Sequence, residues 1–74
     1  MILPTKHLKL SNSLLSAGAA LLKNVDEPKT VSLLWDKTRP LPEIRTFERF
    51  TLSLDLLFIM GIVDFKDGLI RRTQ

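Results

Sequence analysis

The chain has 74 residues, of which 45% are apolar and 26% charged, and its formal net charge at pH 7 is +3. These values are typical of one small globular domain and argue against a disordered chain. There is no cysteine, and the only histidine is His7, which argues against a four-ligand zinc site and favours the reducing cytoplasm. No apolar run reaches the ~18 residues of a membrane span, and the first ten residues do not read as a secretory signal.

Residues 1–10, MILPTKHLKL, predict an extended arm, because Pro4 is incompatible with a helix interior or a central strand. Thr5, Lys6 and His7 form a polar cluster after it. Two interpretations of this cluster remain open: a contact for a partner or for phosphate, and an ordinary solvated loop. A single histidine without a nucleophile or acid close by in the sequence does not predict an active site.

Two helices are predicted after the arm. The first, Ser13 to Asn24, follows a run of capping side chains and ends before Pro28. The second, Val31 to Thr38, is capped by Thr30 and ends before two prolines. Apolar residues at helical spacing predict the core sides. These are Leu14, Leu15, Gly18, Leu21, Leu22 and Val25 in the first helix and Val31, Leu34, Trp35 and Thr38 in the second. Trp35 is the expected core anchor, with a place in an interface as the alternative.

The stretch from Thr46 to Gly61, TFERFTLSLDLLFIMG, predicts a central helix that Thr46 caps and Gly61 closes. At 100° per residue both of its sides are apolar. The core side comprises Phe47, Phe50, Leu54, Leu57 and Phe58, and the outer side comprises Leu52, Leu56, Ile59 and Met60. A chain this small cannot wrap such a helix, so we expect the outer side to bind another protein. The alternatives are a two-fold dimer, or cover by residues 1–3 or the first helix.

Residues 62–72 predict a β-hairpin, because Asp67-Gly68 is a type I′ turn pair between two β-rich runs. The expected cross-strand pairs are Lys66–Leu69, Phe65–Ile70, Asp64–Arg71 and Val63–Arg72. The order of arm, three helices and hairpin predicts a single domain over residues 1–74. Its class is mainly α with a C-terminal β-hairpin, a winged helix-turn-helix in which residues 62–72 form the wing.

A helix-turn-helix favours DNA binding, but function has to be argued from the site. A DNA-reading helix presents polar and basic side chains to base edges, whereas the outer side of this central helix is apolar. The candidate nucleic-acid contacts are scattered: Arg45, Arg49, Lys66, Arg71 and Arg72. We therefore expect a protein-docking module, with a DNA-binding regulator as the alternative. No phosphate loop, carboxylate pair or nucleophile motif predicts catalytic, cofactor or metal residues.

The motifs together resemble a known family. LPTKH near the start, SLLSAGAALL in the first helix, DEPKTVSLLWD leading into the second, and FERFTLSLDLLFIMGIVDFKDGLIRR to the end are similar to the small middle component 6 proteins of ABC-three-component systems. The resemblance covers almost the whole chain. Its most specific parts are LPTKH and the block from LDLLFIMG onward.

This resemblance implies a bacterial conflict locus directed against phages or plasmids. Such loci encode an ABC ATPase related to SMC and RecN proteins, a small middle component, and a third component that often carries an effector. The resemblance implies a non-enzymatic link between the other two components, with ATP bound by the ATPase. It adds weight to Pro4, Thr5, Lys6 and His7 as partner contacts and supplies no catalytic residue.

Overall fold

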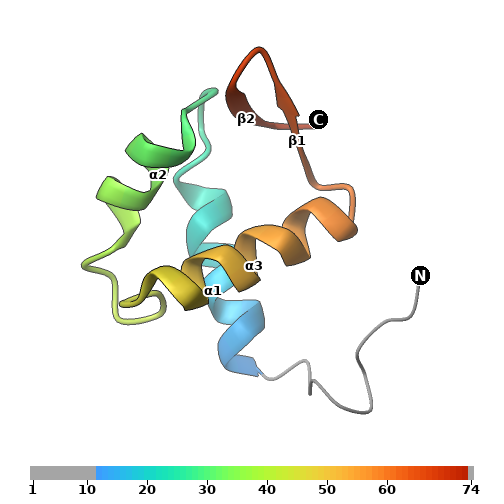
Figure 1. Cartoon of the computed structure of the whole chain (residues 1–74). Helices are drawn as coiled ribbons and strands as arrows, with labels where there is room; N and C mark the ends of the chain where they lie inside the picture. Colours follow the sequence, from blue (N-terminus) through green and yellow to red (C-terminus); the bar gives the residue numbers. More distant parts are fainter. Residues whose placement is uncertain (1–11, 74) are drawn as a thin grey trace.

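The computed structural model describes residues 12–73 of the chain. Three helices are followed by one antiparallel hairpin, and α3 crosses α1 while the hairpin stands beyond the end of α3 (Figure 1). The elements are α1 (Asn12–Lys23), α2 (Val31–Thr38), α3 (Phe47–Ile59), β1 (Val63–Lys66) and β2 (Leu69–Arg72). This order confirms the predicted fold of helices with a C-terminal hairpin. The winged-helix class stays a prediction, and the predicted arm lies outside the described residues.

The buried side of α1 differs from its prediction. The helix begins and ends one residue earlier than expected. Leu15, predicted for the core, is 42% exposed, and Ala17 is fully buried instead. The reason is that α3 crosses α1 at its run of small residues. A Cβ atom placed on Gly18 would lie only 3.5 Å from the Leu57 side chain, so the contact is centred on these small residues rather than on the first turn.

The second helix, α2, has the predicted bounds and the predicted Thr30 cap. Leu34 and Thr38 are fully buried, and the Thr38 hydroxyl donates a hydrogen bond to the Leu34 carbonyl oxygen. One expectation for this helix was wrong, because Val31 is 37% exposed. Trp35 packs against the core as predicted but is only half-buried. A helix of two turns presents only a narrow line to the core, and Leu34 and Thr38 occupy it.

Both ends of α3 form as the sequence predicts. The Thr46 hydroxyl accepts a backbone hydrogen bond at the start of the helix. At the other end Gly61 has a φ of +74°, its N–H bonds to the Phe58 carbonyl, and the Ile62 N–H bonds to the Leu57 carbonyl. This closure requires a left-handed residue after the cap, which is why glycine stands there.

The core lies on one side of α3. Phe50, Leu54 and Leu57 are buried as predicted, and Phe58 is half-buried. The expectation for Phe47 was wrong, because this side chain is 53% exposed. It is the first residue of the helix, and its ring packs at the margin of the core instead of within it. The core comprises Ala17, Leu21, Val25, Leu34, Ile44, Phe50, Leu54, Leu57, Val63 and Ile70.

The hairpin has the predicted register, with Val63 opposite Arg72, Asp64 opposite Arg71, Phe65 opposite Ile70 and Lys66 opposite Leu69. Asp67 and Gly68 have φ values of +56° and +79°. A two-residue type I′ turn requires positive φ at both central positions, and its twist matches that of the flanking strands. The Asp-Gly pair therefore determines the register locally.

Contacts that the sequence does not predict fasten the hairpin to the connection between α1 and α2. Lys29 and Ile70 exchange backbone hydrogen bonds of 3.0 and 2.7 Å. The Arg72 guanidinium donates a 3.0 Å bond to the Val25 carbonyl oxygen. The Lys29 side chain is 4% exposed, and its ammonium lies 2.6 Å from Asp26, which lowers the pKa of that carboxyl group. These contacts hold the hairpin against the end of α1 and the connection that follows it.

Candidate functional site

The outer side of α3 carries exposed apolar side chains. Leu52, Ile59 and Met60 are 47%, 48% and 54% exposed. Leu56 is half-buried and faces α1, since its Cδ2 atom would lie 4.0 Å from a Cβ atom placed on Gly18. We call Leu52, Leu56, Ile59 and Met60 the α3 surface. The structure thus leaves three of its four predicted members exposed to solvent, and the fourth is partly covered by α1.

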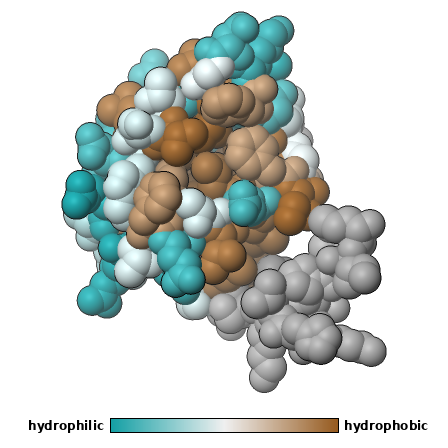
Figure 2. Space-filling view, in the orientation of Figure 1, coloured by the Kyte–Doolittle hydropathy of each residue, from teal (hydrophilic) through white to brown (hydrophobic). Residues whose placement is uncertain are grey.

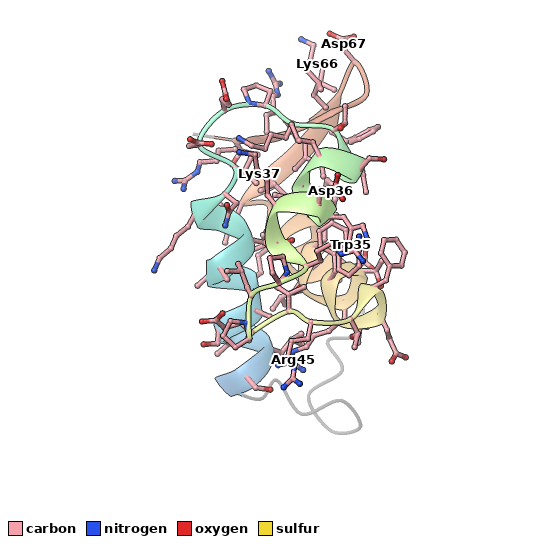
Figure 3. The ribbon with its side chains drawn as sticks, turned by 90° about the vertical axis from the view of Figure 1, so that its left-hand side faces the viewer. Trp35, Asp36, Lys37, Arg45, Lys66 and Asp67 are labelled. Atoms are coloured by element: carbon pink, nitrogen blue, oxygen red, sulfur yellow. The ribbon has the colours of Figure 1, made fainter. Side chains whose placement is uncertain are left out.

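A second group of apolar side chains, which the sequence did not predict as a group, is accessible on α2 and α3. Trp35 lies on the side of α2 that faces α3 (Figure 3), and its ring centroid is 5.2 Å from that of Phe47 in an edge-to-face arrangement. Both rings also pack on the buried Phe50. Phe58 follows Phe47 by eleven residues, which places it on the same side of α3. We call Trp35, Phe47 and Phe58 the aromatic surface.

The hairpin adds one more exposed aromatic side chain. Phe65 is 56% exposed although its partner Ile70, on the same hairpin face, is fully buried. Apolar side chains gather over α3 and continue between α2 and the hairpin, with a few hydrophilic residues among them (Figure 2). The signal for these residues in the sequence was weak. Phe65 stands between Asp64 and Lys66, and Phe47 directly precedes two charged residues.

The five basic residues predicted as nucleic-acid contacts are largely occupied within the fold. The Arg49 Nε donates a 2.7 Å hydrogen bond to the Glu43 carbonyl oxygen. Arg71 donates a 2.7 Å bond to Asp64, which holds the pKa of that carboxyl group below its usual value. Arg72 is bound to the backbone at the end of α1. Three of the five guanidinium or ammonium groups therefore already have partners.

The structure does not bring these basic residues together into one cluster. Arg45, with a φ of +66°, lines an open hollow at the start of α3 together with Arg49 and Thr46. Lys66 lies at the hairpin tip, at the opposite end of the molecule from Arg45 (Figure 3). Arg72 lines a different hollow, beside Met60. Phosphate attraction needs clustered positive charge, so this arrangement is unfavourable for a nucleic-acid interface.

Other kinds of site find little support in the described part of the chain. Residues 12–73 contain no group of three His, Cys, Asp or Glu side chains placed to hold a metal ion. None of the three helices within that range has the length and apolar character needed to cross a membrane. The predicted partner contacts Pro4, Thr5, Lys6 and His7 lie outside the described residues.

Comparison with known proteins supports the resemblance given by the motifs. Residues 3–73 match the family model described as ABC-three component (ABC-3C) system Middle Component 6. Neither the curated proteins nor the solved structures gave a match. Because the family model spans nearly the entire sequence, including all three helices and the hairpin, the chain belongs to the middle component 6 family of ABC-three-component systems.

Proposed function

We propose that this chain is a non-enzymatic adaptor that links an SMC/RecN-like ABC ATPase to an effector component in the bacterial cytoplasm, in defence against phages or plasmids. Membership in a family of middle components implies protein partners. The observation that carries the proposal is the α3 surface, where Leu52, Ile59 and Met60 are each about half exposed. Side chains of this kind grouped on one helix are typical of an interaction site.

The energetics favour docking over permanent exposure. Fully burying a leucine or isoleucine side chain contributes roughly 1.5–3 kcal/mol. In the folded chain Leu52 and Ile59 are each about half buried, so about half of this free energy is still available from each side chain. Covering both by a partner therefore contributes on the order of 2 kcal/mol to binding. That amount corresponds to more than a tenfold change in affinity.

The proposal includes a winged helix that binds protein rather than DNA. The Lys29–Ile70 bridge ties the hairpin to the connection between the first two helices. In this interpretation α2 and α3 form the helix-turn-helix unit, and α3 takes the place of the recognition helix. Its exposed Leu52 and Ile59 cannot hydrogen-bond to base edges but suit an apolar partner surface.

The test compares two sets of substitutions in a chain co-expressed with the ABC ATPase and the third component of its locus. Leu52→Gln with Ile59→Gln removes the apolar contact without adding charge, and glutamine keeps helix propensity near that of leucine. Leu33→Gln is the matched control, because Leu33 is 44% exposed on α2 outside the α3 surface. We expect the double variant to bind its partner at least about tenfold more weakly, with an unchanged melting temperature, and the control to bind normally.

Leu56 is a poor probe for this test, since it is half-buried against α1 and its substitution would also disturb folding. If the Leu52/Ile59 double variant binds both components with wild-type affinity, the α3 surface is not the docking site and the proposal is wrong. Sedimentation provides the second readout. A wild-type dimer that the double variant converts to a monomer with full partner affinity would assign the surface to self-association.

A further inference from the structure

Two carboxylates interrupt the apolar surroundings of α3. Glu48 and Asp55 are both exposed and lie seven residues apart, which places them on one line of the helix about 10 Å from each other. Among the eight acidic residues of the chain, four form ion pairs: Asp26, Glu27, Asp36 and Asp64. Within residues 12–73, Glu48 and Asp55 form no ion pair.

Asp55 contributes little to the stability of the folded chain. Glu48 lies in the first turn of α3, where the helix dipole favours a negative charge. Asp55 lies past the middle of the helix, where that benefit has gone and where aspartate is a poor helix former. Its carboxylate has neither a hydrogen bond nor an ion pair to another side chain of residues 12–73. The contribution of Asp55 therefore has to be sought outside the fold.

Glu48 and Asp55 lie where a docked partner would cover them. At 100° per residue they lie between the α3 surface, represented by Leu52 and Ile59, and the aromatic surface, represented by Phe47. A partner that covers both apolar surfaces has to cover the carboxylates as well. Removing a carboxylate from water is strongly unfavourable unless a positive group pairs with it. The partner that fits this surface is therefore apolar and carries positive charge at its centre.

We propose that the occupant of this surface is a segment of the protein partner whose contact face is apolar and bears two Lys or Arg side chains about 10 Å apart, opposite Glu48 and Asp55. An amphipathic helix with basic residues two turns apart has this form. The inference rests on the proposed function and specifies the chemistry of the partner. It assigns Glu48 and Asp55 to selecting the partner and the apolar side chains to most of the affinity.

Other occupants fit this surface less well. Nucleic acid is unfavourable, because the two carboxylates would repel phosphate. A second copy of the chain offers no free cation along its own α3, where the only basic residue is Arg49 and its Nε is bound to the Glu43 carbonyl oxygen. Two copies of α3 would instead bring their carboxylates together, which is repulsive.

The experiment neutralises Glu48 and Asp55 and compares this variant with a control in which two other acids are neutralised. Glu48→Gln with Asp55→Asn removes two negative charges from the surface. Glu43→Gln with Asp67→Asn removes the same number elsewhere, from acids that also lack an ion pair in the described chain. Asparagine suits position 67, where φ is +56°. Binding to the purified ABC ATPase and to the purified third component is measured by calorimetry at low and high salt.

We expect the Glu48/Asp55 variant to bind its partner about tenfold more weakly at low salt, and its affinity to lose most of its salt dependence. The Glu43/Asp67 control should match the wild type in both respects. An unchanged affinity and salt dependence in the Glu48/Asp55 variant would overturn this inference. If Leu52→Gln with Ile59→Gln weakened binding while the Glu48/Asp55 variant did not, the proposed function would stand and the inference about the partner's charge would be wrong. If neither variant weakened binding, the proposed function and this inference would both be wrong.

Two further outcomes identify a different occupant and would also overturn the inference. One is a gain in affinity for duplex DNA in the Glu48/Asp55 variant with protein binding unchanged. The other concerns thermal stability in a double-mutant cycle of the full chain, which combines the Glu48/Asp55 variant with Lys6→Gln and Lys9→Gln. In this outcome each set of substitutions lowers the stability, and the combined variant loses less than the sum of the two separate losses. That result would assign residues 1–11 of the same chain to the surface.

Discussion

The two sides of α3 have nearly the same composition and opposite environments. On the inner side Phe50, Leu54 and Leu57 are at most 6% exposed. On the outer side Leu52 and Ile59, from the same thirteen residues, are close to 50% exposed. Apolar character alone therefore does not distinguish residues that fold the chain from residues available to a partner.

The difference between the sides comes from the number of neighbouring elements. The inner side receives α1, α2 and the hairpin, so its side chains are enclosed by the core. Among the elements of residues 12–73, it is the edge of α1 that reaches the outer side, at Leu56. Apolar burial on the inner side already stabilises the folded chain, whereas on the outer side the same kind of side chain can still contribute to binding.

The largest expected effect on stability is that of Phe50→Ala, on the inner side of α3. Phe50 is fully buried, and truncating a buried phenylalanine costs roughly 3–5 kcal/mol of the free energy of unfolding. For a small domain this is much of the total stability. Phe47→Ala removes the same ring from a site that is 53% exposed, with an expected cost of about 1 kcal/mol from the lost ring contacts. Urea unfolding measures both, and equal costs would contradict the distinction between inner and margin positions.

A smaller effect is expected for Thr46→Ala, which weakens the helix that both sides share. The Thr46 hydroxyl accepts a 3.1 Å hydrogen bond from the Arg49 N–H, and loss of such a cap costs about 1 kcal/mol. Thr46→Ser, which keeps the hydroxyl, should retain most of the stability. Thermal unfolding gives the comparison, and a Thr46→Ala variant as stable as the wild type would show that tertiary packing alone holds the start of α3.

The sequence predicted the features that depend on neighbouring residues. The Asp67-Gly68 turn determined the hairpin register, and the Thr46 cap and Gly61 closure determined both ends of α3. Each follows from backbone geometry within a few residues. The attachment of the hairpin through Lys29 and Arg72 was not predictable in this way, because its partners are distant in the sequence.

Burial was harder to predict, since it depends on how the helices cross. The spacing of Leu15 agreed with a core position, but α3 crosses α1 at Ala17 and Gly18 and leaves Leu15 in solvent. Phe47 likewise has core spacing and lies at the margin. Helical periodicity gives the direction of a side chain around its own axis but not the place along that axis where a neighbour packs.

The exposure of the candidate site was predictable to a similar extent. Leu52 and Ile59 lie opposite the core stripe of their own helix and are exposed, as that spacing predicts. The aromatic surface was missed because it combines Trp35 from α2 with Phe47 from α3, which only the tertiary fold places 5.2 Å apart. The lack of an ion pair at Asp55 within residues 12–73 likewise emerges only from the packed structure.

The smallest effect concerns Asp64, an acid that has a partner within the fold. Arg71 donates to it over 2.7 Å across the hairpin and lowers the pKa of its carboxyl group. A carboxyl group whose folded pKa is depressed stabilises the fold above its unfolded value of about 3.9, and this stability is lost as the pH falls through the lower folded value. We expect Asp64→Asn to be slightly less stable than the wild type at pH 7, and the difference to shrink as the pH falls below about 3.9. Because both side chains are about half exposed, solvent screening keeps the effect small.

Denaturation of wild type and Asp64→Asn at neutral and acidic pH measures this difference, and partner affinity is measured on the same samples. Asp64 pairs within the hairpin, so its substitution should leave partner affinity unchanged. Substitution of Asp55, which has no ion pair within residues 12–73, should weaken it. A stability difference that stays constant down to acidic pH would show that the Asp64–Arg71 ion pair contributes nothing to the fold. A loss of partner affinity in Asp64→Asn would extend the docking surface from α3 onto the hairpin and remove the contrast between the two acids.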